Sequence, residues 1–82
     1  MYRNVYYSNG VKAVSMPEIE MHGNRSAMVE GCRGILEYAE NVVRINANSM
    51  ILCFNGRGLR IKYLGDSGIE IAGVISSLEF TV

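Results

Sequence analysis

The chain has 82 residues, which is enough for one compact domain and too few for two. Eight Lys and Arg residues balance eight Asp and Glu residues, so the formal net charge is zero and gives no general attraction to a polyanion. The hydrophobic fraction of 49% excludes an intrinsically disordered chain. No constellation of residues defines a reaction, so these numbers predict a folded domain without naming its function.

Cysteine content and apolar runs bear on the compartment. Cys32 and Cys53 are too few for a disulfide framework and lack the paired spacing of a zinc or redox motif, which favours a reduced cytosol. The longest apolar run, Met50 to Phe54, has five residues, against roughly 20 for a bilayer span. The N-terminus shows no signal-peptide pattern. We therefore expect a cytoplasmic protein without direct membrane insertion.

Residues 1–16 differ in composition from the rest of the chain. They hold three of the five tyrosines, Tyr2, Tyr6 and Tyr7, and two basic residues without an acidic one. We interpret this segment as a mobile or partner-dependent arm, and an edge hairpin turning at Asn9-Gly10 is the alternative. The folded domain is expected over residues 17–82.

Beyond residue 17, short pieces between glycines alternate apolar and polar residues, which is the period of a strand with one buried face. A helix over 28–38 is rejected because Gly31 and Gly34 interrupt it, each costing about 1 kcal/mol relative to Ala. Glu40-Asn41 predicts a turn. The first strands are expected around residues 19–21, 27–30, 35–39, 43–46 and 50–54.

The second half of the chain continues this pattern. Asn55-Gly56 predicts a two-residue hairpin turn, and residues 65–68 predict another turn. Strands are expected around residues 59–63, 69–71 and 74–80. Seven or eight short strands predict a single all-β domain, either a small sandwich or a rolled antiparallel sheet, with a short stacked β-solenoid as the alternative.

The residues expected to face the core share one parity within these strands: Ile19, Met21, Ile35, Val43, Ile45, Leu52, Phe54, Leu59, Ile61, Tyr63, Ile69, Ile71, Leu78 and Phe80. The central strand is exceptional because Ile51 and Cys53 make its other face apolar too, so we expect both faces to be buried. A partner subunit or the arm would cover the second face. Ile51, Cys53 and the three arm tyrosines are therefore the expected contacts of a homo-oligomer, with a dimer favoured.

Two groups of residues suggest chemistry, and both have a simpler structural explanation. Ser67 lies in a Gly-Asp-Ser-Gly segment similar to that around the nucleophile of trypsin-like proteases, and His22 is the only histidine. A triad needs more than these two residues, so we interpret the segment as a turn and expect no catalytic site. His22, Cys32 and Cys53 are too scattered to predict a metal site, and no cofactor is expected. Cys53 is expected to act as a small hydrophobe and Cys32 to lie in a turn, where exposure is one option, and a structural role is expected for both.

Arg57, Arg60 and Lys62 form the densest basic cluster and suggest an alternative function, a small nucleic-acid-binding β domain. Tyr63 has core parity, which would make it unavailable for base stacking. A solvated strand face is therefore the favoured explanation of the cluster, and no nucleic acid is expected as a partner.

The order of segments from Pro17 onward resembles the YabP/YqfC family of sporulation proteins of endospore-forming Firmicutes, closer to the YqfC branch. The similar segments are residues 17–24, 29–30, 33–38, 43–45, 52–56, 59–62 and 69–80. Met50 departs from the glycine that similar sequences often carry, and Cys53 and Phe54 from more usual aliphatics, which predicts a shifted turn at Asn48-Ser49.

The resemblance implies a non-enzymatic protein needed for spore envelope or coat formation. It places the protein in the mother-cell cytoplasm during sporulation, with the forespore surface as a further location. It also implies a membrane-associated sporulation protein as a partner. Composition and periodicity by themselves indicate only a β domain suited to assembly.

Overall fold

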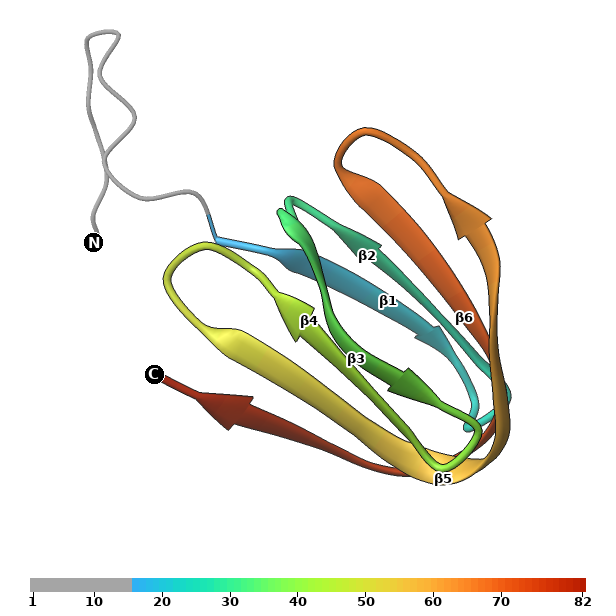
Figure 1. The fold of residues 1–82 in the computed structure, drawn as a ribbon. Coiled ribbons are helices and arrows are strands. Elements are labelled where there is room, and N and C mark those ends of the chain that lie inside the picture. The colour runs from blue at the N-terminus through green and yellow to red at the C-terminus, as the bar shows by residue number, and fades with distance from the viewer. Residues whose placement is uncertain (1–15) are drawn as a thin grey trace, which may run out of the picture.

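The computed structural model describes residues 16–82, which form six β-strands in one antiparallel sheet (Figure 1). The strands are β1 (Glu18–His22), β2 (Ser26–Glu30), β3 (Gly34–Ala39), β4 (Val42–Asn46), β5 (Ile51–Leu64) and β6 (Gly68–Thr81). Their order in the sheet is β1-β2-β6-β5-β4-β3. The described residues contain no helix, so the all-β prediction is confirmed, and the antiparallel pairing fits a rolled sheet rather than a solenoid.

The two 14-residue strands, β5 and β6, fold this sheet into two layers. The β2 layer contains β1, β2, residues 68–72 of β6 and residues 60–64 of β5. The β4 layer contains β3, β4, residues 51–55 of β5 and residues 77–81 of β6. Figure 1 shows both long strands turning from one layer into the other. Because β5 and β6 each run through both layers, the sequence predicted seven or eight short strands where the structure has six.

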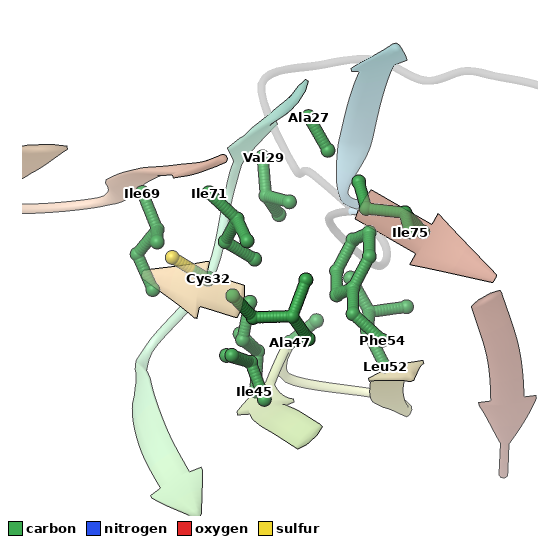
Figure 2. Close-up of a cluster of buried hydrophobic side chains, with 12 residues drawn as sticks. Ala27, Val29, Cys32, Ile45, Ala47, Leu52, Phe54, Ile69, Ile71 and Ile75 are labelled. Atoms are coloured by element: carbon green, nitrogen blue, oxygen red, sulfur yellow. The ribbon is translucent and has the colours of Figure 1, made fainter. Parts of the chain in front are cut away.

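The core lies between the two layers and contains side chains from both of them. Figure 2 shows residues of β2 and β6 pointing toward residues of β4 and β5. The core predictions confirmed as buried are Val43, Ile45, Leu52, Phe54, Leu59, Ile69 and Ile71. Ile19, Ile35, Ile61 and Leu78 are half-buried and pack against this cluster. Burial of these side chains is the main stabilising contribution, since each fully buried one contributes about 1.5–3 kcal/mol.

Three core predictions are wrong: Met21, Tyr63 and Phe80 are 38%, 54% and 58% exposed. The pairing between β5 and β6 shifts between Ile61 and Tyr63, so Tyr63 faces Glu70 on the outer side of the sheet. A β-bulge of this kind reverses the parity of everything beyond it. Met21 and Phe80 keep the expected parity but lie on outer portions of their layers that the other layer does not cover.

The hairpin turn predicted at Asn55-Gly56 is also wrong, because both residues lie inside β5 where the strand bends. Gly56 is needed there because a Cβ atom would lie 1.9 Å from the Val74 carbonyl oxygen. Gly73, at the bend of β6, has a φ of +136°, and its Cβ would lie 2.6 Å from the Gly58 oxygen. The two bends therefore pass each other with backbone in direct contact.

The turns predicted at residues 40–41, 48–49 and 65–68 are confirmed. Gly65 N–H donates to the Gly68 oxygen at 2.8 Å, which closes the turn between β5 and β6. Glu40-Asn41 connects β3 to β4. Ala47 N–H donates to the Met50 oxygen at 2.8 Å and brackets the turn at Asn48-Ser49.

Each short hairpin bonds to the bend of the long strand beside it. In the β5 half of the domain (β3, β4 and β5), Gly56 N–H donates to the Asn41 oxygen at 3.1 Å. In the β6 half (β1, β2 and β6), Gly73 N–H donates to the Arg25 oxygen at 3.0 Å. The two halves thus repeat one backbone arrangement, although their sequences show no repeat.

Candidate interaction surface

The predicted contacts Ile51 and Cys53 lie on the outer side of the β4 layer and are half-buried. Leu52, between them, points into the core and is fully buried. Ile51 lies between Asn46 and Thr81 on the neighbouring strands, and Cys53 lies between Arg44 and Glu79. The outer face is thus an apolar centre flanked by polar side chains. The other predicted contacts, Tyr2, Tyr6 and Tyr7, and nearly all of the 1–16 arm lie outside the described residues.

A hollow of about 380 Å³ opens on this face, at the end of the β4 layer remote from the bends. It combines apolar and polar lining residues: Leu36, Met50, Ile51 and Val82 with Asn46, Asn48, Ser49 and Thr81. Leu36 lines the hollow because the pairing of β3 with β4 shifts between Ile35 and Glu37. Leu36 was not anticipated as a surface residue. Two consecutive apolar residues at 35 and 36 were the signal of that shift.

Polar contacts order the rim of the hollow. Asn48 N–H donates to Asn46 Oδ1 at 3.2 Å, and Arg33 Nη1 donates to Asn48 Oδ1 at 3.1 Å. The Asn48 φ of 74° is a left-handed conformation that asparagine tolerates better than most residues. Arg44 and Glu37 form an ion pair at 3.6 Å, which contributes under about 1 kcal/mol because both groups are exposed. The rim is therefore held by hydrogen bonds, one of them donated by the charged Arg33 guanidinium, more than by the exposed ion pair.

Cys32 is buried, which excludes the exposed position that the sequence left open for it. Its N–H and its Sγ both donate to the Ser67 oxygen, at 3.1 and 3.2 Å, which fastens the β2–β3 connection to the β5–β6 turn. Burial raises the pKa of the Cys32 thiol, and nearby Glu30 raises it further, whereas a backbone hydrogen bond acts in the opposite direction. Cys32 is a structural thiol. Cys53 has its Sγ 3.9 Å from Asn55 Oδ1.

The two residues of the hydrolase hypothesis are not brought together. Ser67 Oγ lies 3.5 Å from Glu30 Oε1, whereas His22 Nδ1 lies 3.3 Å from Ser26 Oγ. Ser26 and Glu30 are the two ends of β2, so Ser67 and His22 lie at opposite ends of the β2 layer. Among residues 16–82, no three His, Cys, Asp or Glu side chains are grouped as a metal site would require.

The basic cluster lies on β5 at and beyond its bend, where Arg57, Arg60 and Lys62 are all exposed. Tyr63 is exposed beside them, contrary to its predicted core position. Three cations and an aromatic ring therefore share one stretch of strand. The same part of the chain, residues 16–82, has no helix long and apolar enough to cross a membrane.

Comparison with known families gives one match. Residues 14–82 match the family model described as the YabP family. Searches of curated proteins and of solved structures found no match. The match covers the whole of the described domain.

Proposed function

Because the chain belongs to the YabP family, which is associated with sporulation, we propose that it is a structural or assembly component of spore envelope or coat formation. The family match over residues 14–82 is the observation that carries this proposal. Within the family we assign the chain to the YqfC branch, on the segments quoted above. We place it in the mother-cell cytoplasm, at or near the forespore surface.

The proposed role is non-enzymatic, and the arrangement of polar side chains supports it. A hydrolase would need a nucleophile, a base and an orienting group within hydrogen-bond reach. Ser67 and His22 instead bond to separate neighbours at opposite ends of one layer. The hollow beside Ile51, with an apolar floor and a hydrogen-bonded rim, suits a contact with a protein. We propose that a membrane-associated sporulation protein binds there.

Deletion of the coding sequence in the spore-forming host tests the role. We expect unchanged vegetative growth and a loss of heat- and lysozyme-resistant spores, restored by the wild-type chain. Within the same strain, Leu36→Lys should restore resistance poorly because it places a charge in the hollow. Leu64→Lys is the matched control, since Leu36 and Leu64 are 50% and 61% exposed. Normal spores after deletion would overturn the proposal.

A second candidate, binding of single-stranded nucleic acid, is favoured by one observation, the exposure of Tyr63 beside Arg60 and Lys62. Such sites combine cations for phosphates with aromatic rings for bases. Against it stand the zero net charge and Glu70, which lies directly opposite Tyr63. Retention of a labelled oligothymidine by the immobilised chain tests whether this surface binds nucleic acid. Retention that falls with salt and is lost in an Arg57→Ala, Arg60→Ala, Lys62→Ala triple variant would establish this function, and flow-through at low salt would exclude it.

A further inference from the structure

Folding one sheet into two layers creates two edges that a flat sheet would not have. Residues 60–64 of β5 pair only with β6, and residues 77–81 of β6 pair only with β5. Each segment therefore has one side without a strand neighbour among the described residues. Such an edge presents unpaired N–H and C=O groups, which are a template for pairing with another chain.

The β5 edge is closed at Ile61 by a side chain of the same chain. Ile61 N–H, which points away from β6, donates to the hydroxyl oxygen of Tyr38 at 3.2 Å. Tyr38 belongs to β3, in the opposite layer. Its side chain therefore takes the position that an added strand would need.

Within residues 16–82, the β6 edge has no such side-chain hydrogen bond. The counterpart of Ile61 is Leu78: Ile61 pairs with Ile71 in one layer, and Leu78 pairs with Phe54 in the other. The counterpart of Tyr38 is Met21, since they pair with the corresponding core residues Val43 and Ala27. A methionine has no hydroxyl group, so it cannot accept the edge N–H in the way that Tyr38 does.

The backbone at this edge points outward. Gly56 N–H points away from β6, toward Asn41, and alternate residues of a strand point the same way. Leu52 and Phe54 therefore direct their N–H and C=O groups toward β4. Their partners across the ladder, Phe80 and Leu78, direct theirs away from β5. These groups have no hydrogen-bond partner within residues 16–82.

Apolar side chains accompany these open backbone groups. Phe80 and Val82 are 58% and 98% exposed, and Leu78 is half-buried on the same side of the strand. We propose that a second copy of the chain pairs antiparallel with residues 78–82, with Phe80 opposite Phe80 at a two-fold axis. This register places Leu78 opposite Val82 and Glu79 opposite Thr81, so the two Glu79 carboxylates do not face each other. Each of the three outward-pointing pairs exchanges two backbone hydrogen bonds.

The second copy is favoured over other occupants because this register is self-complementary. An isologous contact requires one surface to match itself under a two-fold rotation. A strand with apolar residues at 78, 80 and 82, symmetric about residue 80, meets that requirement. The dimer joins two β4 layers into one continuous sheet. This inference rests on the proposed assembly role and specifies one contact within it.

Light scattering on the full chain, across a micromolar concentration series, measures the association. We expect the mass to rise with concentration toward twice 9.1 kDa. Phe80→Lys should weaken dimerisation at least tenfold, since an edge lysine opposes strand addition. Tyr63→Lys is the matched control, because Tyr63 is 54% exposed on the closed edge. Circular dichroism melts identify any variant that fails to fold.

Oxidative crosslinking tests the register independently. In a Cys53→Ser background, Phe80→Cys should form a disulfide-linked dimer, whereas Leu64→Cys should not. The proposed pairing would be overturned if the full chain stayed at 9.1 kDa at all concentrations. It would also be overturned if Phe80→Lys did not weaken the dimer, or if Phe80→Cys formed no crosslink. Protection of this edge in a monomer, lost on removal of residues 1–15, would instead identify the N-terminal segment as its occupant. None of these results changes the phenotype of the deletion strain, so failure of the proposed dimer can be distinguished from failure of the proposed role in sporulation.

Discussion

The two halves of the domain share one backbone arrangement and differ in the side chains that complete it. In each half, the turn of a short hairpin bonds to the bend of a long strand, through Gly56 in one half and Gly73 in the other. At corresponding edge positions, however, one half has Tyr38 and the other has Met21. The bend is therefore bonded by a hairpin turn in both halves, whereas, among residues 16–82, a side chain closes an edge in only one half. The comparison separates the residues that make the fold from those that govern contact with other chains.

The largest expected effect comes from the bends, where the halves touch. Gly56→Ala should lower the free energy of unfolding by on the order of 4 kcal/mol, because its Cβ would meet the Val74 carbonyl oxygen. Gly73→Ala should cost a similar amount, because its φ of +136° is strained for alanine and the Gly58 oxygen is close. Urea denaturation measures both.

Gly34→Ala is the control for these bends. A Cβ there meets no atom within 4 Å and its φ is not positive, so the change should be neutral or slightly stabilising. Equal unfolding free energies of the Gly56→Ala and Gly34→Ala variants would contradict the close backbone contact between the two bends.

The second prediction concerns corresponding core residues of the two halves. Phe54 and Ile71 occupy equivalent positions in β5 and β6 and are both fully buried. Phe54→Ala should cost about 3–5 kcal/mol and Ile71→Ala about 2–5 kcal/mol, since each leaves a cavity. Calorimetry should show both variants unfolding in a single transition. Two separate transitions would mean that the layers do not share one core.

Much of this fold follows from sequence alone, and the exceptions have physical causes. Alternation identified the strands, and the glycine-rich segment at 65–68 identified a turn. The hairpin turn predicted at Asn55-Gly56 was wrong because Gly56 is required by a close backbone contact and not by a positive φ. Local sequence cannot distinguish the two, since the contact is with Val74, 18 residues away in sequence.

The candidate surface was predictable only in part. The outward position of Ile51 and Cys53 follows from parity. Tyr63 was wrongly predicted to face the core and Leu36 was not anticipated, because each lies beside a shift in strand pairing. A shift of this kind is set by the neighbouring strand and leaves only a weak local signal.

A smaller effect is expected at the closed edge. Tyr38→Phe removes the acceptor of the Ile61 N–H and should cost about 0.5–1.5 kcal/mol of unfolding free energy. The control is Tyr63→Phe, because Tyr63 is exposed on the outer side of the sheet. Its unfolding free energy should stay within about 0.5 kcal/mol of the wild type. Equal effects of the two changes in urea denaturation would remove the assigned role of Tyr38.

The smallest effect concerns Cys32 at alkaline pH. Burial raises the pKa of its thiol, so the folded chain keeps the proton at a pH where the unfolded chain releases it. Its contribution to stability is therefore complete below the pKa of the unfolded thiol and declines as the pH rises above it. Cys32→Ala should flatten the alkaline decline in melting temperature. In the folded protein, iodoacetamide should modify Cys53 before Cys32, and the reverse order would contradict the burial of Cys32.

Amide hydrogen exchange, measured residue by residue at low and high protein concentration, tests most directly the claim that the two edges are closed differently. Ile61 N–H should be protected equally at both concentrations, because Tyr38 accepts its hydrogen bond within the chain. Leu78 and Phe80 N–H should exchange rapidly in the dilute sample and become protected in the concentrated one. Protection of all three amides that does not change with concentration would contradict the account.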